Sequence, residues 1–371
     1  MTALPAVNGA HLVGSINQPT AAATLRIVAE NLGSDVARIP DGEVGERFHW
    51  IMFQGAVFAA VDGLVRTAGD PIMVGGFDRR PLTLDGSVAA EQLSFDPLGY
   101  ADAAIASFSE FVALRDSGVI APGTRFQVSV PSPLAALSAF VVDTDQPAVY
   151  PAYAAAIVRE IAEITAAIPA ADLAIQIDMA TEFAFIEQVA LGGTSRVAWF
   201  AGASAEQSVP TAEIISAAAA MAAAVATTIP DAVELGFHLC YGDVAEKHFV
   251  EPADSANLVA TASALAAGIE RPVNWVHLPV PIERDDAAYF APLAELALHP
   301  ETKLFLGLVH HEDGVEGATR RIAAARPVLA SAGLTEFGIG TECGFGRGPA
   351  ERTAPLLRLH HDIIAAASSV D

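Results

Sequence analysis

The sequence predicts a (β/α)8 barrel, and three features support this fold class. Short runs rich in β-branched residues alternate with alanine-rich helical stretches along most of the 371 residues. Eight such runs are present, and polar or sulfur-containing residues follow most of them. Eight βα units in series favour a closed parallel barrel, whose strand ends converge on one mouth. An open α/β sheet is the alternative topology.

The predicted strands and helices account for nearly the whole chain. The strands are expected, in order, at residues 11–15, 36–40, 126–130, 173–178, 234–239, 274–279, 304–309 and 337–341. Helices are expected between most of them, as at 153–168 and 317–333. The apolar stretch 214–229 is too short to span a bilayer comfortably and is interpreted as a buried helix. We therefore expect residues 1–371 to form a single barrel domain.

One interval breaks the alternation. Eighty-five residues, 41–125, separate the second predicted strand from the third, and within them residues 71–86 resemble a hairpin or cap. A long insertion after a barrel strand emerges at the face where active sites are built. The interval 41–125 is therefore predicted to be a lid or a wall of the substrate site.

Composition limits the classes of partner. The net charge is -24 and the pI is near 4.6, and such a field repels phosphate backbones and anionic lipids. Nucleic-acid and membrane binding are therefore not expected, and small molecules are the expected partners, with a homo-oligomer left open. The N-terminus does not resemble a signal peptide, so a cytoplasmic protein is expected. Two cysteines provide no disulfide framework, and metal ligation, catalysis or core packing remain for them.

Candidate functional residues collect after the predicted strands. They are Ser15, Glu43, Asp178, His238, Cys240, Glu283, His310, His311 and Cys343. Any one of them has an ordinary explanation as a helix cap or core residue, but a barrel brings all of these positions to one mouth.

The spacing of His238 and Cys240 predicts a metal site. Alternate residues of a strand share a face, so these two side chains point the same way, and Cys343 follows the last strand. Imidazole and thiolate ligands suit zinc, which prefers tetrahedral nitrogen and sulfur coordination. The fourth position is left to Glu283, His277, solvent or substrate.

The chain resembles the catalytic half of cobalamin-independent methionine synthase and its single-barrel relatives, in the superfamily that includes uroporphyrinogen decarboxylase. The similarity runs from residue 12 to residue 347. It is carried, in chain order, by "LVGSINQP", "PDGEVGERFHW", "VPSPLAALSAF", "LAIQIDMA", "FHLCYGD", "GLVHHEDG" and "TECGFGR".

The resemblance implies a (β/α)8 barrel and a zinc-dependent S-alkyltransferase that activates a thiol such as homocysteine as a zinc thiolate. It implies zinc at His238, Cys240 and Cys343, with Glu283 matching the family's glutamate ligand. A further set is implied to act on substrates: Ser15, Glu43 and Asp178 contact the amino-acid thiol, and His311 (His310 after a one-residue shift in register) stands at the mouth. A mouth histidine is suited to donate a proton to the leaving atom.

Departures from the family pattern leave other readings open. The family's folate-stacking tryptophan is missing from the segment "LSAF", and Met179 and Ala180 replace its Glu-Pro pair. Transfer from a methyl-folate is therefore not implied, and the alkyl donor is left unidentified. The alternatives are an epoxide-opening thiol transferase of the epoxyalkane:coenzyme M type, a metal-free decarboxylase-like lyase, and a catalytically silent binding barrel.

Overall fold

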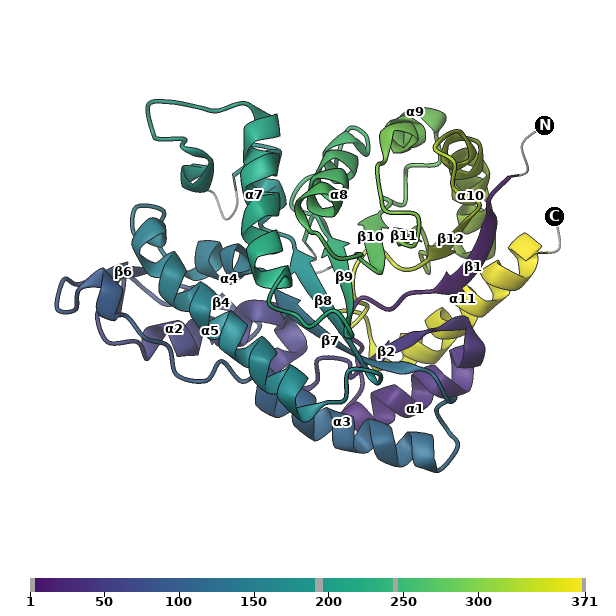
Figure 1. Cartoon of the computed structure of the whole chain (residues 1–371), viewed down its shortest axis with the longest axis horizontal. Coiled ribbons are helices and arrows are strands. Elements are labelled where there is room, and N and C mark those ends of the chain that lie inside the picture. Colours follow the sequence, from purple (N-terminus) through teal and green to yellow (C-terminus); the bar gives the residue numbers. More distant parts are fainter. Residues whose placement is uncertain (1–3, 191–195, 243–245, 369–371) are drawn as a thin grey trace.

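A computed structural model describes residues 4–190, 196–242 and 246–368, and its centre is a barrel of eight parallel strands (Figure 1). The strands run in the order β1-β12-β11-β10-β9-β8-β7-β2. Single parallel bridges from Ala10 to Val36 and from Ser15 to Gly42 join the two ends of this order. The sheet is thus closed, as the sequence predicts, and the open-sheet alternative is wrong.

The barrel strands are β1 (Ala6–Ala10), β2 (Arg38–Pro40), β7 (Arg125–Pro131), β8 (Leu173–Met179), β9 (Glu234–Leu239), β10 (Trp275–Pro279), β11 (Lys303–Gly307) and β12 (Glu336–Ile339). The α-helices are α1 (Ala21–Leu32), α2 (Gln54–Ala59), α3 (Tyr100–Asp116), α4 (Pro133–Phe140), α5 (Gln146–Ala167), α6 (Glu182–Ile186), α7 (Thr211–Ala226), α8 (Ala256–Gly268), α9 (Ala287–Phe290), α10 (Gly314–Ser331) and α11 (Thr353–Ser368). Short 3-10 helices are η1 (Gly33–Asp35), η2 (Gly45–Phe53), η3 (Ala90–Gln92), η4 (Trp199–Ala201), η5 (Ala291–Glu295) and η6 (Ala350–Arg352). No helix among the described residues is long and apolar enough to cross a membrane.

The first strand lies earlier than the sequence predicts. It spans Ala6–Ala10, which pairs with β12, whereas residues 11–15 continue beyond the strand. The backbone of residues 12 and 13 accepts hydrogen bonds from side chains instead: Gln127 donates to the carbonyl of Leu12 at 2.9 Å, and Gln176 to that of Val13 at 2.6 Å. The segment 11–15 therefore lines the interior and the mouth.

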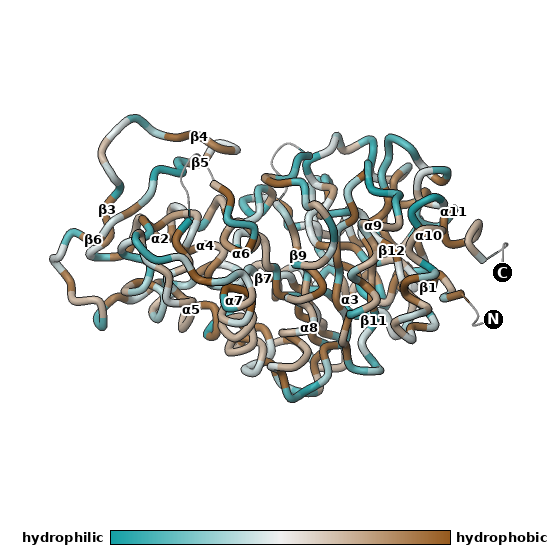
Figure 2. Tube along the Cα trace, turned by 90° about the horizontal axis from the view of Figure 1, so that it is seen from above, coloured by the Kyte–Doolittle hydropathy of each residue, from teal (hydrophilic) through white to brown (hydrophobic). Residues whose placement is uncertain are grey.

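The interval 41–125 contains a small β-structure and a regular barrel helix. The hairpin expected within 71–86 is formed by β4 (Met73–Val74) and β5 (Phe77–Asp78), and β3 (Leu64–Arg66) pairs with β6 (Leu82–Leu84). The β4–β5 hairpin projects on the side of the molecule away from the two termini (Figure 2). The helix α3 packs against α1 and α5 as part of the outer layer, so the irregular portion ends before Tyr100.

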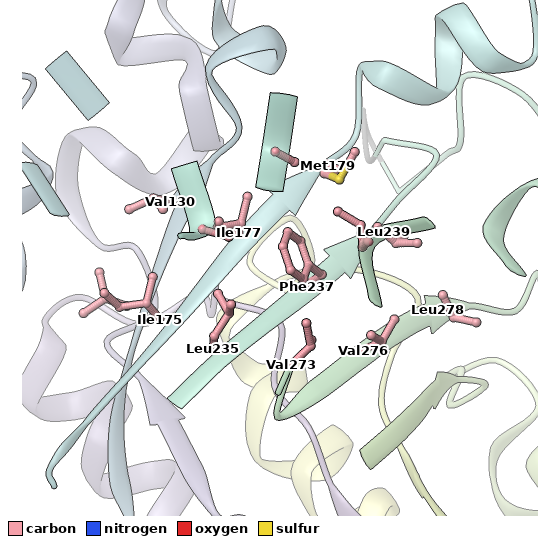
Figure 3. Packing of buried hydrophobic residues seen from close by; sticks show 14 of the residues in the cluster. Val130, Ile175, Ile177, Met179, Leu235, Phe237, Leu239, Val273, Val276 and Leu278 are labelled. Atoms are coloured by element: carbon pink, nitrogen blue, oxygen red, sulfur yellow. The ribbon is translucent and has the colours of Figure 1, made fainter. Parts of the chain in front are cut away.

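Side chains alternate between two environments along the strands. Figure 3 shows apolar side chains of β8, β9 and β10 lying side by side, among them Ile177, Phe237 and Val276. The intervening residues, such as Gln176, His238 and His277, are buried polar groups. Because successive strand residues face opposite sides, the apolar set packs under the helices and the polar set fills the barrel.

Two aromatic rings lie in the barrel interior, and each is paired with a glycine on the adjacent strand: Trp275 with Gly236, and Phe305 with Gly338. Trp275 and Phe305 form a separate buried cluster with Ala174. A Cβ on Gly236 would lie 1.9 Å from the Trp275 ring, and a Cβ on Gly338 would lie 2.3 Å from the Phe305 ring. Because glycine has no side chain at these two positions, the Trp275 and Phe305 rings can occupy the space.

We expect Gly236→Ala to lower the free energy of unfolding by about 1–3 kcal/mol or more, because the Trp275 ring has no room to move aside. Urea denaturation of the two proteins measures the difference. Gly268→Ala is the matched control, since its Cβ would meet only the Cβ of Ala223, at 4.0 Å. Equal midpoints for wild type and Gly236→Ala would contradict this account of the interior.

Candidate metal centre and adjoining cavity

Three potential metal ligands converge at the mouth of the barrel. His238 lies in β9, Cys240 directly follows that strand, and Cys343 lies in the loop after β12. One ligand atom from each lies within 4.8 Å of the others, and the two sulfur atoms are 3.7 Å apart. A tetrahedral ion with bonds of about 2.3 Å to sulfur separates two sulfurs by roughly 3.8 Å, whereas a disulfide requires about 2.05 Å. The geometry fits zinc.

A buried imidazole pair orients the histidine ligand. Nδ1 of His238 lies 2.9 Å from Nδ1 of His277 on the neighbouring strand, so one of these nitrogens is protonated and the other accepts. Burial lowers the pKa of both rings, which are therefore neutral at pH 7. Nε2 of His238 is buried and has no hydrogen-bond partner among the described residues. With the proton of His238 on Nδ1, this Nε2 offers its lone pair to a metal, as is usual for histidine ligands.

The residues considered for a fourth ligand lie outside this group. His277 uses Nδ1 in its bond to His238, and Glu283 is exposed on the rim of a neighbouring pocket. Among the described residues, only His238, Cys240 and Cys343 bring three potential ligand atoms within 4.8 Å of one another. The ligand role of Glu283 therefore stays a prediction from the resemblance.

The three predicted substrate contacts line one small cavity with the metal group. Ser15, Glu43 and Asp178 are all buried. Burial raises the pKa of Asp178, and the nearby charge of Glu43 raises it further. Burial also raises the pKa of Glu43, from 4.5 to about 7. Removal from water favours the protonated form of both carboxyl groups, and for Glu43 the charges of Arg47 and Arg347 oppose that shift.

Local hydrogen bonds hold the carboxyl group of Asp178 and the backbone of Glu43 in place. Nε2 of Gln176 donates to Asp178 Oδ1 at 2.8 Å, and the Trp50 side chain also hydrogen-bonds Asp178. Glu43 has a left-handed backbone with φ of 52°, and its N–H donates to Asp41 Oδ1 at 2.9 Å. Asp41 is in turn paired with Arg47 at 2.6 Å. The Glu43 conformation is thus imposed by its surroundings.

Two cavity residues were missed by the sequence reasoning. Trp50 lies at the kink inside η2 with φ of 54°, and Arg347 follows Cys343 in a glycine-rich loop. Arg347 donates to the carbonyl of Phe48, which ties this loop to the start of the insertion. Both residues belong to segments that the resemblance singled out, "GERFHW" and "TECGFGR". Membership of those two segments is the sequence signal that could have identified Trp50 and Arg347 as cavity residues.

The adjacent histidines after β11 occupy different environments in a second pocket. Nε2 of His310 donates to the carbonyl of Val280 at 2.9 Å, and burial lowers the pKa of His310 to about 4. The side chain of His311 is 36% exposed, and its Nδ1 lies 3.0 Å from Glu312 Oε2. The two form an ion pair when the imidazole is protonated. Both line a pocket of about 410 Å³ that also contains Cys343, and neither lines the smaller cavity. A proton-donor role for His311 stays a prediction.

No protein-family model matches the sequence, and no curated protein sequence matches it. Solved structures do match over their full length. A B12-independent methionine synthase from Shewanella sp. W3-18-1, in complex with selenomethionine, is 13% identical, with a TM-score of 0.60 and coverage of 99% of this chain and 98% of that chain. A Listeria monocytogenes protein provisionally named as a vitamin-B12-independent methionine synthase is 15% identical, with a TM-score of 0.57 and coverage of 98% of both chains. At these identities the likeness shows a shared fold, in agreement with the barrel described above.

Proposed function

We propose that this protein is a zinc-dependent S-alkyltransferase that acts on a thiol bearing an α-ammonium group, such as homocysteine. The observation that carries the proposal is that one cavity contains both a two-sulfur, one-nitrogen metal group and two buried carboxyl groups. The solved barrels that resemble this chain are described as methionine synthases, and one of them was obtained with selenomethionine, an amino acid with a methylated selenium.

In this proposal each part of the cavity has a separate task. His238, Cys240 and Cys343 hold the metal, and His277 keeps the His238 ring in the ligating tautomer. Zinc bound at such a site lowers the pKa of a thiol, so that the nucleophilic thiolate persists at neutral pH. Glu43 and Asp178 receive the ammonium group of the acceptor, and Arg347 supplies a positive charge on the same wall for its carboxylate.

The alkyl donor must approach from outside the small cavity. The 410 Å³ pocket shares Gly242, Cys343 and Gly344 with it, so a donor there would face the acceptor across the metal group. His311, on the rim of this pocket, is the proposed proton donor for a leaving atom that departs with a negative charge.

We expect gently purified protein to contain about one zinc per chain, and Cys240→Ser and Cys343→Ser to lose it, because each removes one thiolate ligand. Inductively coupled plasma mass spectrometry gives the stoichiometry. His361→Asn, an exposed histidine paired with Asp35 far from the ligands in the sequence, should retain zinc and serves as the control. Zinc that is absent from the wild type, or unchanged in both cysteine variants, would exclude the metal-dependent mechanism and favour a metal-free lyase or binding barrel.

We expect Glu43→Gln and Asp178→Asn to weaken homocysteine binding by about 1.5–3 kcal/mol each, the scale of a hydrogen bond to a charged group. Isothermal titration calorimetry on zinc-loaded protein measures this loss. Glu46→Gln is the matched control, because Glu46 is exposed and does not line the cavity. Binding of a sulfonate thiol in place of homocysteine would instead favour the epoxide-opening alternative.

The raised pKa of Glu43 predicts a pH-dependent stability difference. The folded protein keeps this carboxyl protonated up to about pH 7, whereas an unfolded chain releases the proton near 4.5. The wild type should therefore lose stability relative to Glu43→Gln as the pH rises from about 4.5 to about 7. We expect equal stability near pH 4.5, and at pH 8 an advantage of about 1–3 kcal/mol for Glu43→Gln. Urea unfolding of both proteins at these two pH values measures this, and a gap that does not change with pH would refute the burial argument.

A further inference from the structure

The carboxyl group of Glu43 faces two arginines but, within the described chain, forms an ion pair with neither. Burial raises its pKa, and the positive charges of Arg47 and Arg347 act against that rise. Arg47 forms its ion pair with Asp41 instead, at 2.6 Å. Arg347 donates to the carbonyl oxygen of Phe48. Both counter-charges that act on Glu43 are therefore committed to other acceptors.

Asp41 is the residue that holds Arg47. Nη2 of Arg47 donates to Asp41 Oδ2 at 2.6 Å and Nη1 to Oδ1 at 3.2 Å, an arrangement that matches a planar guanidinium to a carboxylate. The hydroxyl of Ser107 donates to Oδ2 at 2.7 Å, and the N–H of Glu43 donates to Oδ1 at 2.9 Å. Burial opposes ionisation of Asp41, but the charge of Arg47 and these hydrogen bonds lower its pKa below the ordinary value. Asp41 is therefore a carboxylate at pH 7.

Arg47 has a second anionic partner within reach. Asp41, Glu43 and Arg47 line the same small void, so the guanidinium could approach Glu43 if Asp41 released it. The Glu43 carboxyl group lies against Gly14, whose Cβ would be 2.6 Å from Oε1, and it also lines the cavity that contains the metal group. An ion pair with Arg47 would satisfy this carboxylate internally and leave it less able to bind a cationic group of a ligand.

We infer that Asp41 is a positioning residue, which holds Arg47 away from Glu43 and so keeps the Glu43 carboxylate free for the ammonium group of the acceptor. The inference rests on the function proposed above and concerns the same cavity. Asp41 itself does not line that cavity, so it acts through its neighbours. By accepting from the N–H of Glu43, it also supports the left-handed backbone at that residue.

Asp41→Asn removes the charge of this residue and preserves its shape. The remaining oxygen can still accept from the N–H of Glu43, whereas the new amide NH2 faces Nη2 of Arg47 and cannot accept from it. Calorimetry on zinc-loaded protein at pH 8 should show homocysteine binding about tenfold or more weaker, the scale of one lost hydrogen bond to a charged group. The zinc content should not change.

Removal of the competing cation should reverse this loss. The double variant Asp41→Asn with Arg47→Gln should bind homocysteine to within about threefold of the wild type, because no guanidinium then occupies Glu43. Binding by the double variant that is as weak as that of Asp41→Asn would overturn the inference, since a purely structural role of Asp41 predicts that result. Asp172→Asn, which breaks the 2.6 Å pair with Arg115 outside the cavity, is the control and should preserve the affinity.

A measurement without ligand separates this inference from the proposed function. In Asp41→Asn, Arg47 should pair with Glu43 and lower its pKa. The loss of stability relative to Glu43→Gln as the pH rises from about 4.5 to about 7 should then disappear. Urea unfolding of the wild type, both single variants and the double variant at the two ends of this range measures the change. The other groups that face Glu43 are the same in all four proteins: Arg347 after β12, Asp178 on β8 and Tyr100 on α3.

The two outcomes of this cycle are distinct. A pH-dependent loss that persists at its wild-type size in Asp41→Asn would overturn the inference, whatever the affinity for homocysteine. A loss that disappears in Asp41→Asn, in a protein whose wild type does not bind homocysteine, would support the positioning role of Asp41 and remove the proposed acceptor.

Discussion

The pairing of β1 with β12, the first and last barrel strands along the chain, is the constraint on which the mouth of this barrel depends. β1 pairs with β12, and beyond the paired region Ile16 bridges to Phe345. The two segments approach so closely that a Cβ on Gly344 would lie 2.3 Å from Ser15 Oγ. This contact fixes the loop that carries Cys343, and thereby sets its sulfur 3.7 Å from that of Cys240, which directly follows β9.

Hydrogen bonds between buried polar side chains in the barrel interior hold the cavity residues in position. Nε2 of His11 donates to Gln176 at 2.7 Å, and Gln176 donates in turn to Asp178 at 2.8 Å. On the neighbouring strands β9 and β10, His277 hydrogen-bonds His238. Buried polar groups that are paired in this way cannot reorient without losing a hydrogen bond in a medium of low dielectric constant. Carboxyl and ligand atoms are therefore held in place before any substrate binds, which lowers the ordering cost of binding.

Much of the architecture could be predicted because the relevant signals are local. Strand periodicity gives seven barrel strands at nearly their observed positions, and the alternation along β9, extended by one residue, brings His238 and Cys240 to one site. The first strand is predicted too late in the chain because the apolar residues 11–15 resemble a strand. In the structure, side-chain amides rather than a neighbouring strand donate hydrogen bonds to the carbonyls of residues 12 and 13. Trp50 was missed because its side-chain direction depends on a left-handed backbone at a kink, which sequence periodicity does not encode. Glu283 was expected at the metal, but whether a loop residue reaches that point depends on tertiary packing, and here it is exposed.

X-ray absorption spectroscopy at the zinc edge tests the central claim most directly, because it reads the ligand set rather than the quantity of metal. The account predicts a first shell of two sulfur atoms at about 2.3 Å and lighter atoms at about 2.0–2.1 Å, including one imidazole. Addition of homocysteine should raise the sulfur count to three, as the acceptor thiolate enters the position that protein residues leave open. A first shell of nitrogen and oxygen alone, or a sulfur count that does not change with saturating homocysteine, would contradict the account.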